Sequence, residues 1–158
     1  MSEIKSISST PFSRIVSDAV MPMLKRPPRL QVAALCTRDG PDGLEVLMIT
    51  SRGTGRWILP KGWPMPHRSL AEAAAQEAWE EAGVRGRVDA APLGDYAAQK
   101  DTDGGLAVPC RVTVFRLHVE SLVNSFPEAT RRNRRWFRPA EAATLVREPE
   151  LRALLKAL

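Results

Sequence analysis

The sequence predicts an α/β protein in which helices pack on a β-sheet. Two strand-like runs, at 30–37 and 44–50, flank a polar turn with two Asp-Gly pairs, which predicts an antiparallel hairpin. A helical segment with signals at both ends follows at 69–83, and a long apolar strand is predicted at 107–119. Strands on both sides of a central helix in the sequence are typical of layered α/β domains.

The remaining elements are shorter and follow from turn and helix signals. Residues 57–59 form a short apolar strand, and residues 85–99 continue as extended chain after the helix. A turn is expected at 100–105 because Asp and Gly dominate it. Two prolines open the last helices, at 139–146 and 150–158, the second of which carries a leucine stripe.

Composition and charge fit one folded domain. Of the 158 residues, 44% are hydrophobic and 26% are charged, which is ordinary for a globular protein. We expect an N-terminal arm at 1–28 and a single domain at 29–158. The 23 Lys and Arg against 18 Asp and Glu give a net charge of +5. This excess favours an anionic partner without choosing among phosphorylated small molecules, nucleic acid and an acidic protein.

The sequence also predicts where the protein acts. No apolar run approaches the roughly 18 residues of a membrane helix, and the first residues lack the apolar core of a signal peptide. A cytoplasmic location and no membrane partner are therefore the simplest expectations.

Cys36 and Cys110 each lie in an apolar, strand-like run, so we expect two buried thiols and no disulfide framework.

The central helix carries clear end signals. Ser69, with Glu72 three residues later, forms a capping box, and Gly83 is placed to end the helix in the left-handed conformation. The helical wheel predicts a buried stripe of Ala71, Ala75, Ala78, Trp79 and Ala82. Ala73 and Ala74 fall beside the acidic residues, where they would leave room for a ligand.

Three glutamates of this helix, Glu77, Glu80 and Glu81, are spaced i, i+3 and i+4 and therefore share one face. Like charges this close destabilise an isolated helix by roughly 0.2–0.5 kcal/mol per i,i+4 pair. A hard divalent cation removes that repulsion, and Mg²⁺ typically binds through one or two carboxylates together with substrate phosphates. Spacing alone favours a solvated acidic face over a metal site, since such faces are common.

The longer stretch at 59–84 resembles the Nudix box. In that box a Gly is followed after five residues by Glu, and after seven more by Arg-Glu-apolar-x-Glu-Glu-x-Gly-apolar. Here the Gly is Gly62, and the closing segment at 76–84 retains all three helix acids. Two positions depart from the pattern, because Arg68 stands for the first Glu and Gln76 for the Arg. In the family these two positions are commonly a supporting ion pair and not the metal ligands.

The resemblance implies the Nudix fold, an α/β/α sandwich with a mixed β-sheet. It extends beyond the box, over about residues 29–146. The run TGRWILPKGWP at 54–64 is similar to the box entry of the branch that hydrolyses diphosphoinositol polyphosphates and diadenosine polyphosphates. The later Arg-Arg-Trp-Phe at 134–137, followed by Glu141, is similar to the C-terminal segment of that branch.

The resemblance also implies an activity. We expect a Mg²⁺-dependent pyrophosphohydrolase, with Mn²⁺ as the alternative metal, that acts on diadenosine polyphosphates, inositol pyrophosphates or a related nucleoside diphosphate derivative. Glu77, Glu80 and Glu81 are the expected metal ligands, and Glu80 and Glu81 are the candidates for the catalytic base. Acids outside the box that are candidates for a further ligand are Asp101, Asp103 and Glu120.

Cationic and small residues are the expected contacts to the phosphates. The expected substrate-binding residues are Ser51, Arg52, Lys61, Gly62, Arg134 and Arg135. Hydroxyls, glycine amides and Arg forks all suit phosphate oxygens, so the loop at 51–56 is either a phosphate-gripping loop or an ordinary connection. Arg134 and Arg135 can serve a highly charged substrate or form a solvated cationic face.

Other functions remain open at the level of sequence. One keeps the fold and changes the substrate to RNA 5′ ends or damaged nucleoside triphosphates, which would require stacking aromatic residues near the site. Trp63 is a candidate for that role, whereas Trp57 and Trp79 are expected in the core. Another is a catalytically impaired binding module, motivated by the two departures from the box.

Nucleic-acid binding through the cationic run at 131–135 is weakly indicated, because no aromatic residues interleave with it. The sequence fits a monomer or a homodimer.

Overall fold

The computed structural model describes residues 27–101 and 105–158, so the predicted arm at 1–28 lies almost entirely outside the described residues. The elements are β1 (Arg29–Gly40), β2 (Gly43–Thr50), β3 (Trp57–Ile58), β4 (Lys61–Gly62), α2 (Leu70–Ala82), β5 (Val84–Val88), β6 (Gly94–Asp101), β7 (Ala107–Leu122), β8 (Arg134–Phe137), α3 (Pro139–Leu145) and α4 (Pro149–Lys156). No helix of the described residues is long and apolar enough to cross a membrane.

The strands form one mixed sheet. Its order is β3-β2-β1-β7-β5, with β4 paired to β1, β6 paired to β7 and β8 paired to β2. β1 and β7 run parallel, and the other pairs are antiparallel. The predicted hairpin is confirmed: β1 and β2 pair from Thr37 opposite Val46 to Gly40 opposite Gly43. The predicted turn at 100–105 is wrong at its start, because Lys100 and Asp101 still belong to β6, and residues 102–104 lie outside the described residues.

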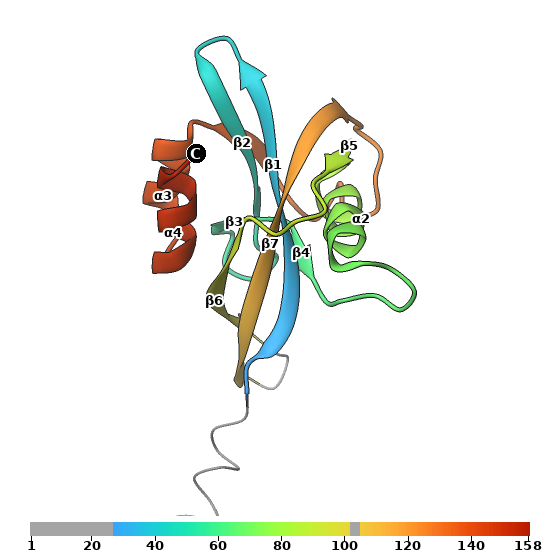
Figure 1. Cartoon of the computed structure of the whole chain (residues 1–158), viewed down its shortest axis with the longest axis vertical. Helices are drawn as coiled ribbons and strands as arrows, with labels where there is room; N and C mark the ends of the chain where they lie inside the picture. The colour runs from blue at the N-terminus through green and yellow to red at the C-terminus, as the bar shows by residue number, and fades with distance from the viewer. Residues whose placement is uncertain (1–26, 102–104) are drawn as a thin grey trace, which may run out of the picture.

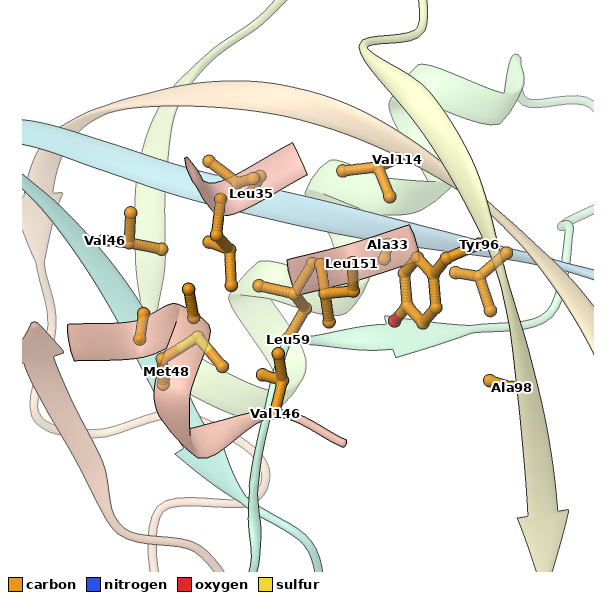
Figure 2. Close-up of a cluster of buried hydrophobic side chains, with 14 of the residues drawn as sticks. Ala33, Leu35, Val46, Met48, Leu59, Tyr96, Ala98, Val114, Val146 and Leu151 are labelled. Carbon is orange, nitrogen blue, oxygen red and sulfur yellow. The ribbon is translucent and has the colours of Figure 1, made fainter. Parts of the chain in front are cut away.

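Helices cover both faces of the sheet, which confirms the predicted α/β/α sandwich (Figure 1). α2 lies against one face, where its alanines pack on Val32, Ala34 and Leu117. α3 and α4 lie against the opposite face, over a second cluster that includes Leu35, Met48, Leu59, Tyr96 and Leu151 (Figure 2). Cys36 and Cys110 are buried free thiols, one in each cluster, as the sequence predicts.

The predicted ends of α2 are confirmed. The Ser69 hydroxyl accepts from the Glu72 amide at 3.1 Å, and the Glu72 carboxylate accepts from the Ser69 amide at 3.3 Å. This reciprocal pair satisfies two amides that the first helical turn leaves without partners. Gly83 ends the helix with φ of 67°, and its amide donates to Trp79 O. Because α2 begins and ends at these residues, its acidic side is fixed relative to the sheet.

The predicted buried stripe of α2 is confirmed for Ala71, Ala78 and Ala82 and is wrong for Ala75 and Trp79, because the helix is rotated from the predicted orientation. Ala73 and Ala74 are fully buried against the sheet, whereas Trp79 is only half-buried and carries the Arg85 guanidinium 3.5 Å from its ring centroid. A helix whose inward residues are alanines approaches the sheet closely, and the volume of a tryptophan does not fit into that gap. The rotation turns Glu81 toward the sheet edge, where it is 6% exposed.

We expect Gly83→Ala to destabilise the protein. A Cβ at this position would lie 2.5 Å from both Phe126 Cδ1 and Val123 O, and an Ala at this positive φ is strained in addition. The free energy of unfolding should fall by roughly 1–3 kcal/mol, measured by urea denaturation. Gly53→Ala is the matched control, since nothing lies within 4 Å of its added Cβ, and its change should stay within about 0.5 kcal/mol. Equal effects of the two changes would contradict this account of the end of α2.

Candidate functional site

A cavity of about 640 Å³ opens where the loop after β2, the short strand β4 and the end of β6 meet. Its lining residues are Ser51, Arg52, Gly53, Thr54, Arg56, Ile58, Lys61, Glu81, Gln99, Lys100, Asp101 and Arg132. The cavity therefore joins segments that are far apart in the sequence. None of the described lining residues is aromatic, and five of them are cations.

The two residues of β4 connect this cavity to α2. Lys61 pairs with Ala33 and Gly62 with Val32 of β1, and successive side chains of a strand point to opposite faces. Lys61 thus lines the cavity, while Gly62 faces α2. A Cβ on Gly62 would lie 2.2 Å from Glu77 Oε1, so a glycine is required for the carboxylate to approach this strand. The contact of the Gly62 amide with phosphate stays a prediction.

Glu81 is the most buried acid of the site. Its Oε2 accepts from the Lys61 amide at 3.3 Å, and its Oε1 lies 3.4 Å from Arg132 Nη2. Burial raises the pKa of Glu81, and the Glu77 carboxylate adds to the rise, whereas Arg132 opposes it. Burial also raises the pKa of Glu77, and repulsion by Glu80 adds to it. The helix therefore holds carboxylates that are buried and close to one another, and for both reasons ionising them is costly.

A fourth acid, Glu128, joins the three predicted from the sequence. The loop before β8 is fastened to the end of α2, because Val123 N donates to Gly83 O at 2.9 Å and Glu128 N donates to Glu80 O at 3.0 Å. The Glu128 carboxylate contributes to the raised pKa of both Glu77 and Glu81. Glu128 was missed because it lies far from the box in the sequence and belongs to no motif.

Two cations that line the cavity, Lys61 and Arg56, are each held by a buried partner. Lys61 Nζ donates at 2.9 Å to Oε1 of Gln31, a fully buried residue of β1. Burial lowers the pKa of Lys61, and the neighbouring Lys100 lowers it further. Arg56 Nη1 lies 2.9 Å from Oε1 of Glu148, which is 8% exposed at the start of α4. These contacts fix the charges in place at the cavity wall.

Three buried nitrogen donors around the cavity lack hydrogen-bond partners in the described part of the chain. They are Gln31 Nε2, Arg56 Nη1 and Arg132 Nε. The Arg56 nitrogen is close to Glu148 but is not aligned for a hydrogen bond. Buried donors without acceptors are costly, and two of these three belong to residues that line the cavity, Arg56 and Arg132.

The loop at 51–56 is held by its own hydrogen bonds. Ser51 Oγ lies 2.8 Å from Thr54 Oγ1 and accepts from the Arg56 amide at 3.2 Å, while Gly55 supplies a positive φ of 70°. Arg52 reaches from this loop to within 3.5 Å of Glu128 Oε1. Ser51 and Arg52 thus line the cavity, and a direct phosphate contact by either stays a prediction.

The structure does not bring the predicted pair Arg134 and Arg135 to the cavity. Arg134 Nη1 donates to Ala82 O at 2.6 Å and to Val123 O at 2.8 Å, so this side chain clamps the loop to the end of α2. The Arg135 guanidinium lies over the Phe137 ring, 5.0 Å from its centroid. The cation that the run at 131–135 does contribute to the cavity is Arg132.

The three acids expected outside the box have different positions. Asp101 lines the cavity at the end of β6. Glu120 is exposed on β7 and is not among the lining residues, and Asp103 lies outside the described residues. Neither His67 nor His118 is among the lining residues, and His118 pairs with Asp89 at 3.1 Å.

The two departures from the box contact each other. Arg68 Nη1 donates to Gln76 Oε1 at 3.2 Å, and Gln76 Nε2 donates to Glu80 Oε1 at 2.9 Å. The two substitutions remove the ion pair that these positions commonly form in the family. In the structure a hydrogen bond joins the same two positions.

The donor set fits a hard divalent cation by its chemistry. Mg²⁺ prefers carboxylate oxygens and commonly keeps places for substrate phosphates. Burial and, after it, repulsion between carboxylates raise the pKa of Glu77 and Glu81, and a bound cation would favour their charged forms. Within residues 27–101 and 105–158, no three acidic, His or Cys side chains are already converged as a metal-binding group. Binding would therefore require small side-chain movements, with Glu77, Glu80, Glu81 and Glu128 as the available acids.

A comparison with protein families matches residues 27–158 to the NUDIX domain. The chain belongs to the NUDIX domain family. The resemblance predicted from the box is thereby confirmed, although two of its positions depart from the pattern. The family match begins at the first residues that the structure describes and covers all of the described elements.

Curated relatives of this NUDIX domain include plant and animal proteins. Nudix hydrolase 13, mitochondrial, of Arabidopsis thaliana is 33% identical over 123 residues, covering 75% of this chain and 61% of that protein. Diphosphoinositol polyphosphate phosphohydrolase 3-alpha of Homo sapiens is 31% identical over 114 residues, covering 71% of this chain and 65% of that protein. The chain spans less than two thirds of the length of these relatives.

Solved structures share the fold. An Ap4A hydrolase of C. elegans matches with a TM-score of 0.58 at 17% identity, over 82% of this chain and 95% of that chain. The NUDIX domain of Shewanella oneidensis NrtR, complexed with ADP ribose, matches with a TM-score of 0.62 at 15% identity, over 89% of this chain and 94% of that chain. Identities this low establish the arrangement of the sheet and helices alone.

We expect the stability of the metal-free protein to fall as the pH rises. Folding raises the pKa of Glu77 to about 7 and of Glu81 to about 8, from an ordinary value of 4.5. The folded state therefore binds more protons than the unfolded state between about pH 4.5 and 8, and the free energy of unfolding decreases over that window. Mg²⁺ should raise the melting temperature more at about pH 8 than at about pH 5.5, because protons compete with it for the carboxylates.

Thermal melts with chelator and with Mg²⁺ would measure both effects. The double variant Glu77→Gln/Glu81→Gln is the control and should lose most of the pH dependence over this window. Melting temperatures that are the same at both pH values, with an equal Mg²⁺ shift, would contradict the crowding of carboxylates on α2.

Proposed function

We propose that the protein is a divalent-cation-dependent pyrophosphohydrolase that cleaves a phosphoanhydride bond in a densely phosphorylated small molecule. The observation that carries this proposal is one cavity in which Glu81 of α2 meets five cations, with Glu77 close to Glu81 and with nitrogen donors of Arg56 and Arg132 that lack hydrogen-bond partners. An anion with several phosphate groups matches that arrangement. The names of the curated relatives, which include diphosphoinositol polyphosphate phosphohydrolases, support the same class of substrate.

The acidic side of the cavity would hold the cation, which we take to be Mg²⁺, with Mn²⁺ as a substitute. When bound, the cation supplies a Lewis acid that neutralises phosphate charge and makes a water more acidic. Glu77 and Glu81 would be its main ligands, with Glu128 beside them. Glu80 would complete the cluster, either as a ligand or as the group that accepts the proton of the attacking water.

The cationic side would bind and orient the phosphates. Lys61 contacts Gln31, and Arg56 contacts Glu148, so both charges are in position before the substrate arrives. Preorganised charges of this kind stabilise the negative charge that develops on the leaving phosphate. Arg132 lies beside the acids, because it contacts both Glu81 and Glu128, and it also lines the cavity. It is therefore placed to bridge the cation site and the phosphates.

The cavity favours recognition of phosphates over recognition of a nucleobase. Among the described lining residues there is no aromatic side chain on which a base could stack. Trp63, the candidate for stacking, carries the Arg29 guanidinium 4.2 Å from its ring centroid, and Lys100 lies 5.5 Å from the same centroid. We therefore place diphosphoinositol polyphosphates first among the substrates and diadenosine polyphosphates second. RNA 5′ ends and damaged nucleoside triphosphates follow, since both present a base.

A binding module without catalysis is the competing function. It rests on the two departures from the box at Arg68 and Gln76. A pure anion binder gains nothing from crowded carboxylates beside its site, which favours the hydrolase. The cytoplasmic location and the choice between monomer and homodimer stay predictions from the sequence, and the names of some relatives carry the word mitochondrial.

Turnover with the purified protein tests the hydrolase directly. In the presence of Mg²⁺ we expect release of phosphate from a diphosphoinositol polyphosphate, followed by phosphate assay or chromatography. Glu81→Gln should lower kcat by roughly 10²–10⁴-fold, the range associated with loss of an acid–base or metal-binding carboxylate. Glu120→Gln, which removes an exposed carboxylate outside the cavity, should leave kcat unchanged. Absence of turnover together with tight binding of the same compound would instead favour the binding module.

Substrate preference tests the recognition of phosphates. We expect kcat/KM for a diphosphoinositol polyphosphate to exceed that for a diadenosine polyphosphate by about tenfold or more, since a stacking platform is worth roughly 1–3 kcal/mol per base and none lines the cavity. Free adenosine should not inhibit either reaction. A higher kcat/KM for the diadenosine compound, with inhibition by adenosine, would contradict this preference.

A further inference from the structure

Gln76 of α2 forms side-chain hydrogen bonds to two residues, Arg68 and Glu80. Its Oε1 accepts from Arg68 Nη1 at 3.2 Å, and its Nε2 donates to Glu80 Oε1 at 2.9 Å. Arg68 belongs to the loop before the helix, and Glu80 lies one helical turn after Gln76. These two hydrogen bonds therefore connect the loop to the acidic cluster.

The chemistry of the two neighbours fixes the orientation of the Gln76 amide. A guanidinium only donates hydrogen bonds, and an ionised carboxylate only accepts them. The amide oxygen must therefore face Arg68, and the amide nitrogen must face Glu80. If the amide turned over, both hydrogen bonds would be lost, and its oxygen would face the carboxylate oxygen of Glu80. Arg68 thus keeps the donor of Gln76 on the side of Glu80.

Glu80 needs such a donor because its neighbours repel it. The Glu80 charge contributes to the raised pKa of Glu77, which shows that the two carboxylates interact. A half-buried glutamate with like charges nearby moves toward solvent unless a hydrogen bond holds it. The backbone of Glu80 is already fixed, because its carbonyl accepts from Glu128 N at 3.0 Å. The Gln76 amide fixes the remaining freedom, that of the side chain.

We propose that Gln76 is a positioning residue that holds the Glu80 carboxylate in the cation-binding cluster, and that Arg68 orients Gln76 for this task. The proposal rests on the proposed function, since it gives Glu80 a role in binding the cation. Arg68 and Gln76, the two departures from the box, then act together as one pair. Arg68 beside an Arg at position 76 would repel it, whereas Gln76 satisfies Arg68 and Glu80 at once.

The pairing makes an unusual prediction for the loop residue. In Arg68→Glu the new carboxylate should accept from the Gln76 amide nitrogen, turn the amide over and take the donor away from Glu80. In the double variant Arg68→Glu/Gln76→Arg, the Arg at position 76 can donate to both carboxylates and should restore the position of Glu80. A second substitution in the site is thus expected to repair the damage of the first.

The measurements are the Mn²⁺ dissociation constant by calorimetry, the Mg²⁺ concentration for half-maximal activity, and the melting temperature. Gln76→Met, which removes the donor and keeps the length of the side chain, should weaken Mn²⁺ binding by about tenfold, as loss of a residue that orients a metal ligand commonly does. Arg68→Glu should weaken it by about threefold to tenfold, and the double variant should return to within about threefold of the unmodified protein. Arg87→Glu is the matched control, since it makes the same charge change on β5, away from the cavity.

A merely structural role of Gln76 would lower the melting temperature without changing the dissociation constant, and that result would overturn the proposal. So would a double variant that binds Mn²⁺ more weakly than Arg68→Glu alone. If the unmodified protein binds no Mn²⁺ and shows no turnover, the proposed function fails together with this inference. If the unmodified protein binds Mn²⁺ and Gln76→Met binds it equally well, only the present inference fails.

Discussion

The site depends on the close approach of α2 to the short strand β4. Gly62 has no side chain, and the inward residues of the helix are alanines, so the Glu77 and Glu81 carboxylates reach the edge of the sheet. There the Lys61 amide donates to Glu81. The approach puts negative charge into a partly buried place, which is unfavourable without a partner. The protein thus retains a local destabilisation that a cation and its phosphates can relieve.

The rest of the structure supports this arrangement from three directions. The loop before β8 is fastened to the end of α2 and contributes Glu128 and Arg132. The sheet contributes Gln31, whose buried amide holds Lys61. The last helix contributes Glu148, which pairs with Arg56 at the far wall. A site assembled in this way uses nearly every layer of the domain, which explains why its residues are scattered along the chain.

Local signals allowed much of the fold to be predicted from the sequence. The capping box at Ser69, the left-handed Gly83 and the Asp-Gly turn of the first hairpin each act within a few residues, and all three occur in the structure. The box likewise located the acids of α2. The inward face of the helix was predicted only in part, because a run of alanines gives no contrast in size or polarity, and the large Trp79 dominated the helical wheel.

Long-range contacts account for what the sequence did not reveal. Glu128 and Gln31 carry no motif, and only the folding of the loop and the sheet brings them to the site. Arg134 shows the opposite error: its cationic neighbours suggested a phosphate contact, but its guanidinium is occupied by carbonyls at the end of α2. Hydrogen-bond partners of this kind depend on tertiary packing and leave no pattern in the sequence.

The most direct test of the account is a crystal structure with Mn²⁺ and a non-hydrolysable phosphoanhydride analogue. Anomalous scattering would locate the cation without reference to the protein atoms. We predict a peak about 2.1 Å from carboxylate oxygens of Glu77 and Glu81, with phosphate oxygens of the analogue completing its coordination beside Lys61 and Arg132. A cation held elsewhere, or an analogue bound in the cavity with no cation at the α2 carboxylates, would contradict the central claim.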